Sequence, residues 1–191
     1  MLLKNGRTSN PLDPMTRAIK EITGKKTKTD EDYEKLSDLE FEASLYWDDE
    51  VGVHFPAENI KAMFYAAAKK IKMGRQTHAI LLDHPLAPIV FPNHKNLKKL
   101  AADPDMRLVN MVVIQKRKTI RTRAKIPAGW TCTFTLLVDE AFMNLETVEQ
   151  ILEIASIQIG CGDWRPGSPS PGTYGTFVIE SIEELKGVVA A

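Results

Sequence analysis

Residues 53–70, VHFPAENIKAMFYAAAKK, decide the fold class that the sequence predicts. They begin as an extended segment that ends at Pro56, and proline suits the start of a helix because its missing N–H costs least there. The helix predicted from Ala57 to Met73 has apolar residues at offsets 0, 3, 4, 7 and 11, which form a stripe on one side. The members of this stripe are Ile60, Met63, Phe64, Ala67 and Ile71.

A second predicted helix, over residues 145–159 and ending at Gly160, repeats the same offsets. Its stripe consists of Val148, Ile151, Leu152, Ala155 and Ile159. Two helices with matching apolar faces are expected to pack side by side. Three predicted strands lie between them, over residues 106–115, 119–126 and 130–138, and a last strand, 174–179, follows a loop rich in Gly and Pro.

From residue 45 the predicted order is β-α-β-β-α-β with one additional strand. This order indicates an α+β fold of modified ferredoxin-like type, in which two helices cover one face of an antiparallel sheet and leave the other face open. A mixed sheet with helices on both faces is the alternative. Two N-terminal helices precede this core, a weak one over Pro14–Ile22 and one over Asp30–Ser44 that Thr29 caps.

The domain organisation follows from this order. Residues 1–28 are expected to be a flexible N-terminal segment, and residues 29–185 a single domain with an irregular Pro-rich insertion at 77–105. With 191 residues, 43% of them hydrophobic, the chain can bury a sizeable core. The start MLLKNGRTSNPLDP lacks the layout of an export signal, and the apolar runs are far shorter than the roughly 20 residues that span a bilayer. We therefore expect a cytoplasmic protein with no membrane partner.

The formal net charge of zero conceals blocks of opposite sign along the chain. Residues 25–50 hold ten acidic side chains against four lysines, whereas residues 95–125 hold ten basic side chains against two acidic ones. A basic block of this kind suits a polyanion. The alternative is a set of solvated lysines at a hairpin tip that pair with the acidic helix.

Strand periodicity predicts which way the basic block points. Alternation places Arg121, Arg123 and Lys125 on the outer face of one strand, with Ile120, Thr122, Ala124 and Ile126 on the core face. Such a row, flanked by hydroxyl groups, can hold the phosphates of a single strand of nucleic acid, although it lacks paired aromatic residues. A solvated sheet face is the alternative. The candidate contacts in this part of the chain are Arg107, Lys116, Arg117, Lys118, Arg121, Arg123 and Lys125.

The loop over residues 160–175 is the second candidate for binding. Its glycines permit close backbone approach, and Trp164 and Arg165 can stack on a base or hold a phosphate. The glycines leave a helix and enter a predicted strand, so they do not match the dinucleotide-binding pattern. In the alternative interpretation the loop is a structural turn, with Gly160 as a helix cap and Trp164 in the core.

Catalytic and metal-binding patterns are weak. The four histidines lack the i, i+4 helical spacing of a zinc pair, and no CxxC, GxSxG or P-loop occurs. The carboxylates of WDDE, residues 47–50, could bind Mg²⁺, but acidic residues are common in turns. We expect no catalytic residue, no metal and no cofactor.

Several runs of the sequence resemble a group of bacteriophage and prophage proteins: residues 23–70, 121–139, 151–167 and 172–180. Within them, VHFPAENIKAMFYAAAKK is similar to the strand, Pro turn and helix of the RAMP superfamily, the repeat-associated RNA-binding proteins of CRISPR systems. The Gly-rich loop resembles the RAMP loop before the final strand. The chain departs from the RAMP pattern after the proline, where Ala57, Glu58 and Asn59 replace the usual Gly-Ser pair.

The resemblance implies a RAMP-like fold whose open face and loops hold single-stranded RNA in the host cytoplasm without catalysis. We therefore expect a non-enzymatic phage or prophage protein that binds single-stranded nucleic acid and can form a homo-oligomer. The alternative is a phage anti-defence protein that contacts a host defence protein or sequesters a signal nucleotide. A structural or accessory phage subunit is a third hypothesis.

Overall fold

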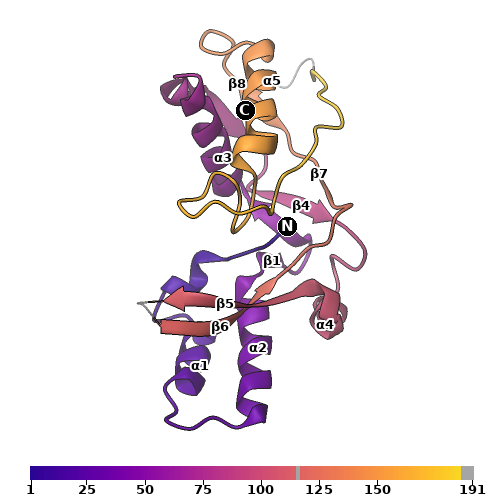
Figure 1. Ribbon diagram of the computed structural model, residues 1–191. Helices are drawn as coiled ribbons and strands as arrows, with labels where there is room; N and C mark the ends of the chain where they lie inside the picture. The colour runs from indigo at the N-terminus through magenta and orange to yellow at the C-terminus, as the bar shows by residue number, and fades with distance from the viewer. Residues whose placement is uncertain (115–116, 186–191) are drawn as a thin grey trace. The chain divides into compact units, whose positions relative to one another are not determined.

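The computed structural model describes residues 1–114 and 117–185 (Figure 1). By its internal contacts the chain divides into two compact units. Unit 1 comprises Met1–His54 and Ile89–Thr131, and unit 2 comprises Phe55–Pro88 and Cys132–Ala191. Helices and antiparallel strands alternate along the chain, so the predicted α+β class is confirmed. The unit boundaries fall inside the range 29–185 that the sequence assigns to one domain.

Unit 1 is built from helices and one long hairpin. Helix α1 packs on α2, and α2 packs on strand β6. The elements of this unit are η1 (Gly6–Ser9), α1 (Pro14–Thr23), α2 (Asp30–Ser44), α4 (Leu97–Ala102), η3 (Pro104–Met106), β5 (Arg107–Ile114) and β6 (Arg117–Ala124). As predicted, Thr29 caps α2: its side chain accepts a hydrogen bond from the Asp32 N–H, and the Asp32 carboxylate accepts one from the Thr29 N–H.

The first residues of the chain belong to the core of unit 1. Leu2 and Leu3 are buried, and the N–H of Leu3 donates to the carbonyl of Ala124 at 2.9 Å. The amino group of Met1 donates to the carbonyl of Ile126 at 2.6 Å. The segment expected to be flexible is therefore anchored at its start, because its apolar residues continue the pairing at the end of β6.

Unit 2 contains the two helices with matching apolar stripes. Its elements are α3 (Ala57–Lys70), η2 (Gly74–Ala79), β3 (Ile80–Leu82), β8 (Leu136–Val138), α5 (Leu145–Ile154) and a π turn, η4 (Ala155–Ile159). Helix α3 packs against α5 and the π turn, which confirms the predicted helix pair. The buried contact residues include Ile60, Met63, Phe64 and Ala67 on α3, and Val148, Ile151, Leu152 and Ala155 on α5 and the turn.

A four-stranded sheet has the order β1-β2-β4-β7. Its strands are β1 (Trp47–Asp48), β2 (Gly52–Pro56), β4 (Leu86–Val90) and β7 (Thr131–Cys132). Strands β1 and β2 form an antiparallel pair, in which Trp47 lies opposite Val53 and Asp48 opposite Gly52. The strand predicted over residues 130–138 is divided, since β7 joins this sheet whereas β8 pairs with β3. This strand order does not by itself establish a ferredoxin-like sheet.

Two further predictions of local structure are wrong. The segment 77–105, expected to be irregular, contains β3, β4 and α4. The strand expected over residues 174–179 does not form, because its backbone groups bond elsewhere. The N–H of Tyr174 donates to the carbonyl of Trp164, the carbonyl of Gly175 accepts from the N–H of Cys161, and the N–H of Phe177 donates to the carbonyl of Ser156 in the π turn.

Candidate nucleic-acid interface

The β5–β6 hairpin of unit 1, residues 107–124, is the C-terminal part of the basic block over residues 95–125. Its register runs from Arg107 opposite Ala124 at one end to Ile114 opposite Arg117 at the other. Thr122 and Ala124 are buried, as predicted for the core face, and so is Ile126. Ile120 is 59% exposed, so its predicted place in the core is wrong. The core face therefore ends at Thr122, and the half of β6 nearer the turn extends past it.

Helix α2 covers the outer edge of β6 with polar side chains. A carboxylate oxygen of Glu40 accepts a hydrogen bond from the Thr122 N–H at 2.8 Å, and the Ser44 hydroxyl accepts one from the Ala124 N–H at 2.8 Å. Glu40 and Ser44 lie four residues apart on one side of α2. Their spacing matches the spacing between the N–H groups of Thr122 and Ala124, which alternate along the strand edge. The helix thus takes the place of a neighbouring strand; Figure 1 shows α2 beside β6.

Two of the predicted contact residues are bound to α2. The guanidinium of Arg121 forms a 2.5 Å ion pair with Glu40, whose side chain is only 6% exposed. Arg107 forms a 2.7 Å ion pair with Asp38, and its guanidinium carbon lies 4.8 Å from the centre of the Phe41 ring. The acidic block and the basic block therefore meet inside unit 1, but the residues that pair with the acidic helix are arginines, whereas the alternative had assigned this role to lysines.

The other predicted residues of the hairpin differ in their surroundings. Arg123 is half-buried and donates to the Thr122 carbonyl at 3.1 Å. Lys125 is half-buried, and Lys118 is exposed. Arg117 begins β6, whereas Lys116 lies outside the described residues. No ion pair forms at Lys118 or Lys125 within the part of the chain that the structure describes.

The candidate contacts named from the sequence do not include the lysines of α4, which lie beside the hairpin. Lys98 and Lys99 are exposed, and Arg107 ties this helix to the hairpin by donating to the Ala101 carbonyl at 2.6 Å. Asn96 caps the helix by accepting a hydrogen bond from the Lys99 N–H. The charge count of residues 95–125 had included these lysines. Their position was missed because the segment was expected to be irregular.

Charge is divided between the two units. Unit 1 contains 18 lysines and arginines and 14 acidic residues, a net charge of +4. Unit 2 contains 7 and 11, a net charge of −4. Because two arginines of unit 1 already face carboxylates, its exposed positive charge is carried mainly by lysines.

The Gly-rich loop of unit 2 folds back on itself. Gly160 ends the π turn with φ +68°, so its predicted role as a cap is confirmed. A Cβ atom at Gly175 would overlap the carbonyl oxygen of Cys161, and the Gly175 φ of +77° also favours glycine. The guanidinium of Arg165 donates to the Gly162 carbonyl at 3.0 Å, so this side chain closes the loop.

Trp164 is the exposed element of this loop. Its side chain is 44% exposed, and its φ of +50° is a strained value for a bulky residue. The Tyr174 ring lies 6.0 Å away, centre to centre, at an angle of 34°. The alternative in which Trp164 lies in the core is therefore wrong. The loop presents two neighbouring aromatic rings, a pairing that the sequence did not predict because 174–179 had been assigned to a strand.

Comparison with protein-family models, with curated proteins and with solved structures found no match.

Two of the three carboxylates of WDDE, those of Asp48 and Asp49, have partners within the turn. Asp48 accepts hydrogen bonds from the N–H groups of Val51 and Glu50, and these bonds hold its pKa below the usual value. Asp49 accepts one from the indole of Trp47 at 3.0 Å. The described residues contain no cluster of three or more His, Cys, Asp or Glu that could hold a metal ion. They also contain no helix that is long and apolar enough to cross a membrane.

The two cysteines are half-buried, and their thiols are shielded enough from water for their pKa values to rise. Burial raises the pKa of Cys132 to about 11 and that of Cys161 to about 12. The Cys161 thiol donates to the Gly175 carbonyl at 3.3 Å. Because the thiolate is the nucleophilic form, neither side chain is activated for nucleophilic chemistry at neutral pH.

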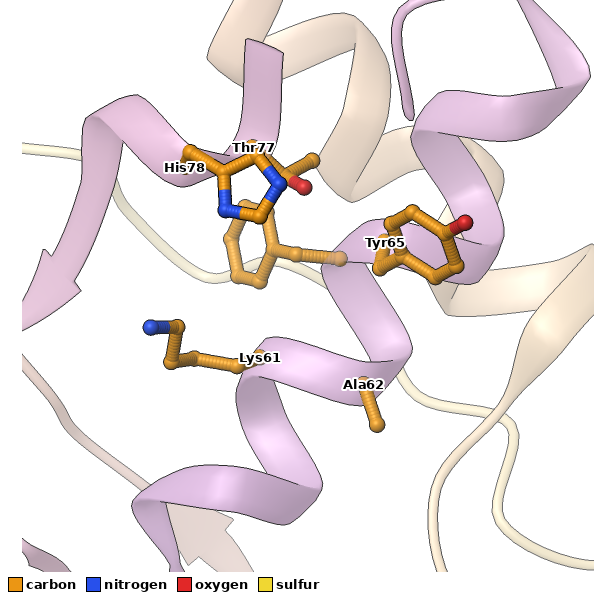
Figure 2. A pocket seen from close by; sticks show the side chains of 6 residues that line it. Lys61, Ala62, Tyr65, Thr77 and His78 are labelled. Atoms are coloured by element: carbon orange, nitrogen blue, oxygen red, sulfur yellow. The ribbon is translucent and has the colours of Figure 1, made fainter. Parts of the chain in front are cut away.

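A small pocket of about 260 Å³ lies between α3 and η2 in unit 2 (Figure 2). Its walls are mainly apolar, and it is lined by Lys61, Ala62, Phe64, Tyr65, Thr77 and His78. The Thr77 hydroxyl is occupied, since it donates to the Gly74 carbonyl at 2.7 Å. The volume lies below the roughly 300–1,000 Å³ of sites that enclose a small molecule. Its chemistry points to no substrate class.

Proposed function

We propose that this chain is a non-enzymatic protein that binds single-stranded nucleic acid, RNA in preference, through the basic residues of β6 and α4. The observation that carries the proposal is a group of lysines that form no ion pair with the residues that the structure describes. Lys98, Lys99 and Lys118 are exposed and Lys125 is half-buried, all in the unit with the positive net charge. Ammonium groups held in this way attract a phosphate backbone whatever its sequence.

The two arginines that face α2 have a different role in this proposal. Arg107 and Arg121 are positioning residues, which fix the hairpin on α2 through Asp38 and Glu40. Their guanidinium groups already have carboxylate partners, so the lysines supply most of the contacts with phosphate. Strand β6, RKTIRTRA, contains no aromatic residue that could stack on a base, which favours binding that is independent of sequence.

The preference for RNA and the phage setting rest on the RAMP-like resemblance, which is part of the proposal. The segment that carries this resemblance forms a strand, a proline turn and a helix: β2 ends at Pro56 and α3 begins at Ala57. Glu58 lies in the first turn of α3, where a negative charge opposes a phosphate. The proposal therefore assigns RNA to the lysines of unit 1 and not to this helix.

Binding of a fluorescently labelled 20-nucleotide RNA, followed by anisotropy at low salt, tests the proposal. The double variant Lys118→Ala/Lys125→Ala is expected to weaken binding by about tenfold or more, since each lost phosphate contact removes a released counterion. Lys61→Ala/Lys70→Ala on α3 removes the same charge from unit 2 and is the matched control. Equal losses in both variants, or no binding by the wild type, would contradict the proposal.

A second candidate function is the capture of a nucleotide by an anti-defence protein. The exposed Trp164 ring and its neighbour Tyr174 favour it, because paired aromatic side chains stack on bases. Calorimetric titration with mononucleotides and short oligonucleotides tests it. The variant Trp164→Gly keeps the positive φ accessible while removing the ring. It should abolish binding, whereas Tyr33→Ala, at an exposed aromatic residue of unit 1, should not.

A further inference from the structure

The two edges of the β5–β6 hairpin differ. The outer edge of β6 is covered, since Glu40 and Ser44 of α2 accept hydrogen bonds from its amides and Leu3 donates to its carbonyl at Ala124. Strand β5 lies on the other side, and within the described residues no strand follows it. The hairpin therefore has one edge that is covered at Thr122 and Ala124, and one open edge, that of β5, that no strand of the described residues covers.

The register identifies which groups of β5 lie on the open edge. The Thr122 N–H points away from β5 toward Glu40, so the pair Val109–Thr122 is a non-hydrogen-bonded pair. Met111, two residues further on, pairs with Ile120 in the same way. Both members of such a pair turn their N–H and C=O groups away from each other. Val109 and Met111 therefore present these groups on the open edge, where the described residues offer them no hydrogen-bond partner.

Apolar, exposed side chains of β5 and β6 lie on one face of the hairpin beside this edge. Val109 is 55% exposed, Met111 64% and Ile120 59%. Directly opposite residues of an antiparallel pair share a face, so these three side chains form one patch. Residues 108–114, LVNMVVI, contain no charged residue, glycine or proline. Exposed edges of monomeric proteins usually have a lysine, a proline or a bulge that blocks further pairing, and this one has none over those seven residues.

We propose that β5 is a subunit interface, through which two copies of this chain pair edge to edge in antiparallel orientation. The two-fold axis lies near Asn110, so that Val109 of one copy faces Met111 of the other. A second copy fits this edge because residues 108–114 carry no charge in either copy, so the pairing brings no like charges together. The adjacent charge of Arg107 is balanced by Asp38. A nucleic acid would require cations that this edge does not present.

The proposed pairing also predicts that association stops at two copies. Joining the β5 strands gives a four-stranded sheet in the order β6-β5-β5-β6. Both outer strands are then β6, and each is covered by α2 of its own copy. This cover reaches Thr122 and Ala124, and the remainder of β6 begins with Arg117 and Lys118, whose charges oppose further edge pairing, so we expect the assembly to stop at a dimer and not to grow into a fibre. This inference is independent of the proposed nucleic-acid binding.

Sedimentation velocity of the full chain over about 1–200 μM, after nuclease treatment and in 0.5 M NaCl, tests the proposal. We expect a monomer–dimer equilibrium. Hydrogen exchange at the two concentration limits should show the amides of Val109 and Met111 becoming protected in the dimer. The variant Val109→Lys should weaken dimerisation at least tenfold, whereas Val178→Lys, the same change at an 82% exposed valine of unit 2, should leave it unchanged.

Several outcomes would overturn the inference. These are a monomer at every concentration, a dimer that nuclease removes, species larger than a dimer, or a dimer in which the Val109 and Met111 amides exchange as fast as in the monomer. Equal dimerisation by the wild type and a folded Val109→Lys variant would also overturn it. The exchange measurement on the wild type decides the matter even where Val109→Lys does not fold.

Discussion

Replacing Glu40 by alanine is expected to destabilise unit 1, because this carboxylate serves two partners at once. One oxygen accepts a hydrogen bond from the Thr122 N–H, and the other forms the ion pair with Arg121. The Glu40 side chain is 6% exposed and that of Arg121 25% exposed. The substitution therefore leaves a buried amide without an acceptor and a half-buried cation without its counter-charge.

The size of the effect follows from these two losses. An unsatisfied buried donor costs about 1–3 kcal/mol. Removing one partner of a fully buried ion pair costs about 3–5 kcal/mol, and this figure must be reduced because Arg121 can turn partly into water. We expect Glu40→Ala to lower the free energy of unfolding by about 3 kcal/mol. Glu40→Gln keeps an acceptor for the Thr122 N–H and should cost less.

Asp38→Ala on the same helix is the matched control. Asp38 also pairs with an arginine of the hairpin, but its side chain is 63% exposed. Exposed ion pairs contribute about 0–1 kcal/mol, and Arg107 keeps its hydrogen bond to the Ala101 carbonyl. Urea denaturation followed by circular dichroism, with hydrogen exchange at the Thr122 amide as a local probe, measures both variants. If Glu40→Ala costs no more than Asp38→Ala, or the Thr122 amide stays equally protected, the described role of Glu40 is wrong.

Two further predictions concern unit 2. Gly175→Ala should lower the melting temperature by several degrees, because the new Cβ overlaps the Cys161 carbonyl at a positive φ, whereas Gly6→Ala, which meets nothing within 4 Å, should change stability by less than about 0.5 kcal/mol. At pH 8, iodoacetamide should modify the folded protein at least a hundredfold more slowly than the unfolded protein, because raised pKa values keep Cys132 and Cys161 protonated. Equal labelling rates of the folded and the unfolded protein would contradict the raised pKa values of these thiols. The two thiols should not affect the free energy of unfolding below pH 9, but this free energy should fall as the pH rises from there toward about 12.

Local and periodic features could be predicted from the sequence. The cap at Thr29 depends only on residues within one turn, and the stripes of α3 and α5 report their buried faces directly. Thr122 and Ala124 were assigned correctly to the core because strand alternation fixes the face of each side chain. The cap at Gly160 follows from the end of an apolar repeat at a glycine.

Features that depend on distant partners could not be predicted. Glu40 was one of ten acidic residues in its block, and no local pattern marks it as the acceptor for an amide that lies 82 residues away. Residues 174–179 have the composition of a strand, but the carbonyl of Gly175 already accepts a hydrogen bond from Cys161. Residues 130–138 resemble one strand, although their two halves pair with different strands. In each case a tertiary contact overrides local preference.

The most direct test of the proposed nucleic-acid binding is the salt dependence of RNA affinity. The logarithm of the association constant, plotted against the logarithm of NaCl concentration, should fall linearly, with a slope of about −0.7 for each phosphate contact. With Lys98, Lys99, Lys118 and Lys125 each contacting one phosphate, we predict a slope of about −3, reduced by about 1.4 in Lys118→Ala/Lys125→Ala. A slope near zero, or one that this variant leaves unchanged, would contradict binding through these lysines.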